Sequence, residues 1–276
     1  MIANNNKSMK HVKRTLLLGI FLFILAGCSD SPTSNKQDDK PAFPDFDLIQ
    51  MDVSYFLQRQ PFKIDGNNTL NDKAYSEAYT YAVNAANLLN AYGATGFAYF
   101  GLAELAQPQF ADNMWNWTYS YQTPGVFTEM KLTSKPANGG YDWNLFLTVD
   151  ITGGESINNQ KIIQGFTSND GNSGNWSLFP AYQGGTTPIL EFSWNIKNES
   201  EMDMMFKIFA EGSNSLVPIF EVNYQSNTPD YMINYINRES SWEKDIYWNT
   251  TSLTGYIVED GIKSCWNQNL ETVDCS

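Results

Sequence analysis

An alternation of apolar and polar residues with a period of two runs from residue 113 to the C-terminus and constrains the fold more than any other feature. In its first run, Trp115, Trp117, Tyr119 and Tyr121 alternate with small polar residues, and the turn-forming pair Pro124-Gly125 follows. Successive side chains of a strand point to opposite faces, so each such run predicts a strand with one buried face. Short runs with turns between them indicate consecutive antiparallel strands. About ten to twelve strands are expected, at residues 113–121, 126–132, 141–151, 162–166, 176–179, 190–196, 202–210, 219–224, 231–236, 246–248, 256–258 and 262–266.

Residues 46–112 combine an irregular stretch with helical segments. Apolar residues recur at helical spacing from Asp72 to Ala91, and Gly93 is predicted to end this helix. A second apolar segment, from Ala94 to Ala106, is expected to be helical and buried. The apolar stripe of the first helix consists of Tyr75, Tyr79, Ala82, Ala86 and Leu89.

A sheet of this width tends to curl, split or close, and its apolar face needs another layer to bury against. We therefore expect a mainly β fold in which a large curved antiparallel meander, residues 113–276, wraps on one or two N-terminal helices. The alternative is a two-sheet β-sandwich. Residues 46–276 are predicted to form a single globular domain, because no break in composition divides them.

The N-terminal residues have the three parts of a secretory signal. Positive charge comes first, and an apolar run at 16–26 follows that is shorter than the roughly 20 residues needed to span a membrane. Leu25-Ala26-Gly27-Cys28, which closes this run, resembles the lipobox of bacterial lipoproteins. That resemblance implies that residues 1–28 contain a signal peptide, that Cys28 carries the lipid, and that the protein is extracytoplasmic. An N-terminal anchor that is never cleaved is the alternative.

Residues 29–45 are predicted to be a disordered tether, because up to residue 42 they are polar, contain prolines and lack periodicity. In some Gram-negative groups, an aspartate after the lipidated cysteine implies retention at the inner membrane, and here Ser29 follows Cys28. The resemblance therefore implies the outer membrane, reached through the N-terminal lipid. Whether the domain faces the periplasm or the cell surface stays open.

The chain is acidic, with 17 Lys and Arg against 30 Asp and Glu. Four of the basic residues and none of the acidic ones lie within residues 1–28, so the mature chain has 13 minus 30, a net charge of −17. Binding to nucleic acid draws its affinity from neutralised phosphates, and the mature chain has only Arg59 and Arg238 as arginines. No nucleic-acid partner is expected.

The single histidine, His11, lies inside the predicted signal. A mature chain without histidine excludes Ser-His-Asp and Cys-His nucleophiles and histidine-containing zinc or copper sites. No P-loop, dinucleotide fingerprint or cysteine-rich zinc pattern occurs, so no cofactor, metal or catalytic residue is predicted. The loop 169–175 is rich in oxygen ligands, and we read it as an Asn-Gly turn in preference to a calcium site.

The remaining two cysteines, Cys265 and Cys275, form an even pair once Cys28 carries lipid. Disulfides persist outside the cytoplasm, so a bond between them is predicted. Two free thiols are the alternative.

Tryptophans supply the candidates for ligand binding. Trp242, Trp248 and Trp266 lie near Asn, Ser and Lys residues and are the better candidates for exposed rings that bind a ligand. The alternative is that these three also belong to the core. Four others, which alternate in step with Leu, Val and Ile, are assigned to the core: Trp115, Trp117, Trp143 and Trp194. The strand carboxylates fall on the opposite parity from the apolar face, where solvated acids normally lie: Glu129, Asp142, Asp150, Glu191, Asp203 and Glu221.

These features predict a non-catalytic, lipid-anchored protein of the cell envelope whose β domain binds an apolar ligand or a glycan. One alternative is a carboxylate-dependent glycan hydrolase, which needs two acids flanking a cleft. Another is a structural or assembly lipoprotein that docks on a second envelope protein through an exposed sheet edge or apolar patch. An exposed edge strand without a pocket would favour the docking alternative.

Overall fold

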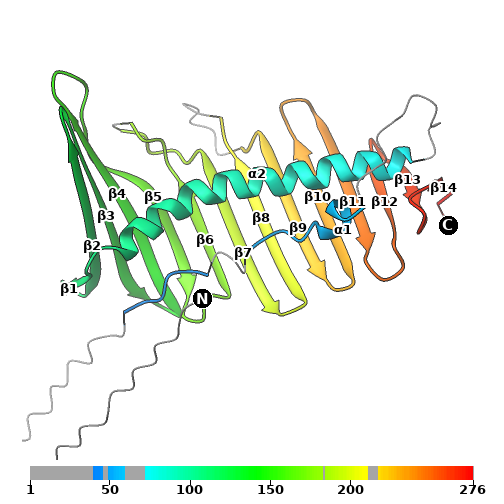
Figure 1. The fold of residues 1–276 in the computed structure, drawn as a ribbon, viewed down its shortest axis with the longest axis horizontal. Coiled ribbons are helices and arrows are strands. Elements are labelled where there is room, and N and C mark those ends of the chain that lie inside the picture. The colour runs from blue at the N-terminus through cyan, green and yellow to red at the C-terminus, as the bar shows by residue number, and fades with distance from the viewer. Residues whose placement is uncertain (1–39, 46–48, 60–71, 183, 211–216, 276) are drawn as a thin grey trace, which may run out of the picture. The chain divides into compact units, whose positions relative to one another are not determined.

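The computed structural model describes residues 40–45, 49–59, 72–182, 184–210 and 217–275. Residues 40–276 form one compact unit. Its strands make a single fourteen-stranded sheet in which each strand pairs with the next one in sequence, always antiparallel (Figure 1). The predicted mainly β meander is confirmed, and the sheet is one open layer where the alternative had two.

The strands are β1 (Gln109–Ala111), β2 (Met114–Thr123), β3 (Val126–Ala137), β4 (Gly140–Ile151), β5 (Ile157–Ser168), β6 (Ser173–Leu178), β7 (Leu190–Asn198), β8 (Glu201–Ile208), β9 (Phe220–Asn227), β10 (Asp230–Asn237), β11 (Trp242–Asn249), β12 (Thr254–Glu259), β13 (Ile262–Trp266) and β14 (Thr272–Val273). The helices are α1 (Ser54–Leu57) and α2 (Lys73–Glu104). Twelve of these strands match the predicted runs. The two additional ones, β1 and β14, are the edge strands, and their three and two residues are too short to show a period.

Helix α2 is one continuous helix of 32 residues, so the prediction that Gly93 ends the first helix is wrong. The cost of a glycine inside a helix is about 1 kcal/mol, which tertiary packing readily offsets. Packing is available at both ends, because α2 contacts β2 and β3 near one end of the sheet and β12, β13 and β14 at the other. Four residues of the predicted stripe are buried, Tyr75, Ala82, Ala86 and Leu89, and Tyr79 is half-buried. The buried side of α2 also includes three alanines outside that stripe: Ala74, Ala78 and Ala85.

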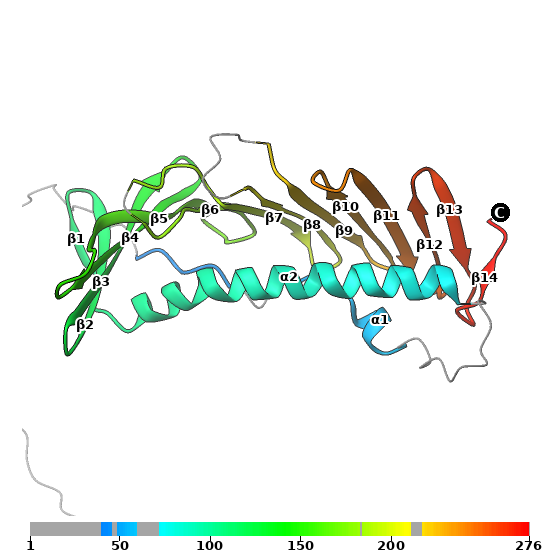
Figure 2. The same ribbon diagram turned by 90° about the horizontal axis from the view of Figure 1, so that it is seen from above.

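We call the face of the sheet toward α2 the inner face. The apolar residues of the alternating pattern lie on this face. Figure 2 shows α2 crossing the strands on this side, with the sheet arched over it. The register places Trp117, Leu132 and Leu145 side by side on this face at one end of the sheet. At the other end Ile233, Ile246 and Ile257 are neighbours, and all three are buried. The opposite, outer face is not covered by any described segment.

The stretch that precedes α2 also lies on the inner face and runs in the opposite direction (Figure 1). Ile49, Met51 and Val53 are buried, and α1 follows them. Further upstream, the ring of Phe43 lies 5.4 Å from that of Trp117 and 5.5 Å from that of Trp143, between ring centroids. Packing against the sheet therefore begins within the range 29–45 for which the sequence predicts a tether. Residues 29–39 of that range lie outside the described part of the chain.

Candidate functional site

Two of the three tryptophans predicted to bind ligand belong to the core. Trp248 is 0% and Trp266 1% exposed, so the expectation of exposed rings is wrong for both. The indole N–H of Trp266 donates to the hydroxyl of Tyr55 at 3.0 Å. Both indoles pack against Phe56 of α1, which covers this end of the inner face.

The third, Trp242, is half-buried and belongs to a cluster around an inward-facing lysine. Its ring stacks on that of Tyr235 at 5.1 Å with an interplanar angle of 2°. Lys244 is 2% exposed, and its ammonium lies 4.4 Å from the centroid of Tyr81 and 5.5 Å from that of Trp242. Glu259, its neighbour on β12, forms an ion pair with it. Aromatic faces and a carboxylate together offset the cost of burying this charge, so the cluster has a structural explanation.

Of the three cysteines, Cys28 lies outside the described residues. Cys265 and Cys275 are at disulfide-bonding distance, with Cα atoms 5.3 Å apart, as the sequence predicts. The bond joins β13 to the C-terminal segment that includes β14, which pairs with β13 at only two positions.

Removing this disulfide is expected to lower the free energy of unfolding by about 2–3 kcal/mol, because the closed loop spans only about ten residues. The measurement is denaturant unfolding of a Cys265→Ser/Cys275→Ser double variant. Wild-type protein treated with a reductant should reach the same stability, and the double variant should not respond to the reductant. A double variant as stable as the oxidised wild type would contradict the prediction.

The six strand carboxylates lie on the outer face, as their parity predicts, and they are spread over β3, β4, β7, β8 and β9. None of them lines the apolar space between α2 and strands β8 and β9, or the pocket beside the β5–β6 turn. Across the described part of the chain, no three Asp, Glu, His or Cys residues are grouped so that they could hold a metal ion.

The gap between α2 and the middle of the inner face is filled. Ala85 and Leu89 of α2 face Met204, Phe206 and Val222 of the sheet there, and these side chains leave no space that a water molecule could occupy. An apolar ligand has no room at this position. The inner face uses its aromatic and aliphatic surface to bind the protein's own helix.

A small polar pocket of about 220 Å³ lies between Phe43, Tyr141 and the β5–β6 turn. In that turn Asp170 accepts hydrogen bonds from the Ser168 hydroxyl at 2.6 Å and from the Asn172 backbone N–H at 3.1 Å. These bonds hold the pKa of the Asp170 carboxyl below its usual range. The carboxylate thus serves the turn itself, and sites for small molecules usually have about 300–1,000 Å³.

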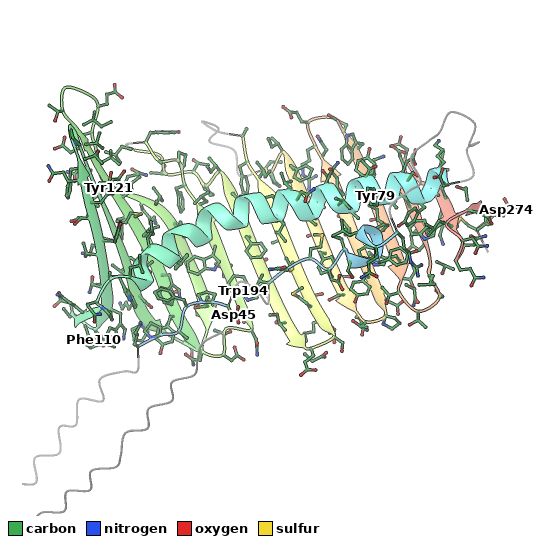
Figure 3. All side chains as sticks on the ribbon, in the orientation of Figure 1. Asp45, Tyr79, Phe110, Tyr121, Trp194 and Asp274 are labelled. Atoms are coloured by element: carbon green, nitrogen blue, oxygen red, sulfur yellow. A yellow bond between two sulfur atoms is a disulfide. The ribbon has the colours of Figure 1, made fainter. Side chains whose placement is uncertain are left out.

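The edge of the sheet at β2 is the most distinctive exposed feature. Strand β2 pairs with β3 along its length, from Trp115 to Thr123, but β1 pairs only with residues 114–116. The remaining stretch, residues 117–123, has no described strand beside it; we call it the open edge. In Figure 3, Phe110 of β1 lies at the lower end of this side of the sheet and Tyr121 lies higher on the same side.

Three residues of the open edge direct their backbone groups away from the sheet. Thr123 and Val126 flank the two-residue turn between β2 and β3, so they form a hydrogen-bonded pair. The backbone N–H and C=O groups of the odd-numbered residues of β2 therefore point toward β3. Even-numbered residues point the other way, as Met114 does toward Ala111 in the turn at β1. Each of Thr118, Ser120 and Gln122 therefore presents one N–H and one C=O at the edge. All three residues are exposed.

Natural edge strands are usually protected by charged residues, proline, bulges or a covering segment. The open edge reads Trp-Thr-Tyr-Ser-Tyr-Gln-Thr, with no charge and no proline, and its register with β3 contains no bulge. The opposite edge differs. There β13 has only five residues, includes Lys263 and carries the disulfide, whose Cys275 sulfur lies 3.5 Å from the Lys263 carbonyl oxygen.

An aromatic and aliphatic patch continues from the open edge onto the inner face. Tyr121 is 48% exposed, and its row on the sheet continues through Thr128 to Val149. Ile151, at the end of β4 in the next row, is 41% exposed. A strand added beside β2 would place its own side chains against this patch. The sequence shows the uncharged run but does not show which strand ends the sheet.

Comparison with known proteins adds no relative: no protein-family model, no curated protein and no solved structure matches this chain. Neither of the helices in the described residues combines the length and the apolar character required to cross a membrane.

Proposed function

We propose that this protein is a lipid-anchored, non-catalytic protein of the cell envelope, at the outer membrane, that docks on a partner chain by strand addition at the open edge. In this mode of recognition a partner strand pairs with an exposed sheet edge, so backbone hydrogen bonds provide affinity and alternate side chains provide specificity. The observation that carries the proposal is the uncharged seven-residue edge, residues 117–123, whose outward backbone groups have no described partner strand.

The lipid anchor in this proposal rests on the resemblance of residues 25–28 to a lipobox. Docking is favoured over an apolar ligand or a glycan because α2 fills the middle of the inner face and the polar pocket is small. A hydrolase is less favoured because the carboxylates on the strands are spread over the outer face.

Site-specific photo-crosslinking in the native host tests the docking mode. A photoreactive residue at Gln122, on the open edge, is expected to give a crosslinked product of defined mass. The same residue at Asn195, which is exposed on the outer face of the central strand β7, is the matched control and should give none.

A Ser120→Pro change in the Gln122 variant should abolish that product. Because the Ser120 N–H points away from β3, proline there removes no hydrogen bond of the sheet but blocks pairing with an added strand. Ser120→Thr should leave the product unchanged, and circular dichroism should show that all variants are folded. Equal crosslinking from Gln122 and Asn195, or a product that persists in Ser120→Pro, would show that the proposed docking mode is wrong.

A further inference from the structure

We propose that the partner at the open edge is a second copy of this chain, paired antiparallel with the first across a two-fold axis at Ser120. This inference rests on the proposed docking function and names its partner. A two-fold axis brings the same surface of both copies together and makes the interface self-complementary. Two copies of β2 related in this way would join the two sheets into one continuous sheet.

The backbone geometry of the open edge allows one register to satisfy all of its outward groups. Antiparallel strands form hydrogen bonds between residues that point toward each other. With Ser120 opposite Ser120 of the partner, Thr118 pairs with Gln122 of the partner and Gln122 with Thr118 of the partner. All three N–H and all three C=O groups of each copy then have a partner. The pairing covers residues 118–122 and stops short of Asn116, the last residue that β1 pairs.

The side chains also match in this register. Tyr119 lies opposite Tyr121 of the partner on the inner face, in a non-hydrogen-bonded pair, where side chains of antiparallel strands come closest. This gives two tyrosine pairs across the axis. On the outer face the residues that meet are threonine, serine and glutamine, whose side chains are small or flexible and uncharged.

Electrostatics permits a second copy at this edge although the chain as a whole is acidic. Two chains of the same net negative charge repel each other. At the open edge the first charges behind β2 are Glu129, opposite Ser120, and Lys131, opposite Thr118. Their charges are opposite, so the seam carries no net charge. Anchoring to one membrane would raise the effective concentration of the copies for each other.

Cysteine crosslinking of the full-length chain in its own membrane tests both the partner and the register. A hydrogen-bonded antiparallel pair has Cα atoms about 5.5 Å apart, within the range of about 4.4–6.8 Å that a disulfide spans. After mild oxidation, most molecules of the Ser120→Cys variant are therefore expected to be covalent dimers. In Thr118→Cys and Gln122→Cys the two new cysteines are offset by four residues, roughly 14 Å, and each single variant should stay monomeric. The double variant Thr118→Cys/Gln122→Cys should form the dimer again, and the wild type should not.

Three results would overturn the inference. One is a Ser120→Cys variant and a double variant that both remain monomeric. A second is equal dimer formation by all single variants, which would indicate random collision. The third is dimer formation by Thr118→Cys alone, which would place the axis elsewhere. If the cysteine variants stay monomeric while the photo-crosslink from Gln122 has the mass of a different protein, the second copy is excluded and strand addition stands. If neither experiment gives a product, both proposals fail.

Discussion

Replacing Phe56 with alanine is expected to lower the free energy of unfolding by about 3–5 kcal/mol. Phe56 is 0% exposed, and its ring links α1 both to α2 and to the sheet. Its ring lies 5.6 Å from that of Tyr75 on α2 and 5.0 Å from that of Trp248 on β11, between centroids. Since α1 has only four residues, it cannot be stable alone and depends on this side chain.

Denaturant unfolding of the Phe56→Ala variant measures this effect. The matched control is Leu57→Ala, one residue further along α1, where the side chain is 50% exposed. That change should alter the free energy of unfolding by about 0.5 kcal/mol or less. If both variants lose the same amount, α1 is not the packing element that the structure shows.

Replacing Trp143 with alanine is expected to cost a similar 3–5 kcal/mol at the opposite end of the sheet. Trp143 is 0% exposed, and its indole N–H donates to the Thr167 hydroxyl at 2.7 Å. Its ring lies 5.9 Å from that of Trp117 and 6.3 Å from that of Trp176, so an alanine would leave a large cavity between β2 and β6.

Trp143→Phe separates ring packing from the hydrogen bond. It keeps most of the aromatic surface, leaves the Thr167 hydroxyl without its indole partner, and should cost about 1–3 kcal/mol. Tyr121→Ala, on the exposed part of β2, is the control for a surface aromatic and should change the stability of the monomer by about 0.5 kcal/mol or less. The midpoint of denaturant unfolding, compared across the three variants, gives the order. A Trp143→Ala variant as stable as the wild type would contradict the assignment of this residue to the core.

Both predictions bear on how the edge variants are interpreted. The stability of the domain comes from the inner face, whose large side chains pack on α2 and on the segment before it. Trp117 of the open edge belongs to that core, but Thr118, Ser120, Tyr121 and Gln122, where the edge variants are made, are exposed. Changes at the edge should therefore affect partner binding without unfolding the protein, so a lost crosslink reports on docking.

The misassigned tryptophans show how far alternation can be used. Trp248 follows Ile246 at a spacing of two, and both are buried on the inner face. The parity rule alone would have placed Trp248 in the core. Polar neighbours such as Asn249 pointed to exposure, but adjacent residues of a strand face opposite sides and report nothing about each other.

Helix boundaries were predicted less well than strands, for a related reason. Gly93 is a reasonable end for an isolated helix, because glycine weakens the helical state. In the folded protein, α2 is held against strands at both ends of the sheet, and that packing is absent from any local window of sequence. Likewise the burial of Phe43 depends on Trp117 and Trp143, which are 74 and 100 residues further along the chain.

The sequence by itself determined the consecutive antiparallel order of twelve strands, the apolar and the polar side of most of them, the acidic charge and the pairing of Cys265 with Cys275. All of these follow from local periodicity, short loops or composition. Only the tertiary structure decided that α2 fills the middle of the inner face, that Trp248 and Trp266 are covered, and that residues 117–123 form an open edge. The physical reason is that exposure depends on which distant segments come to lie beside a strand, whereas alternation is a property of the strand alone.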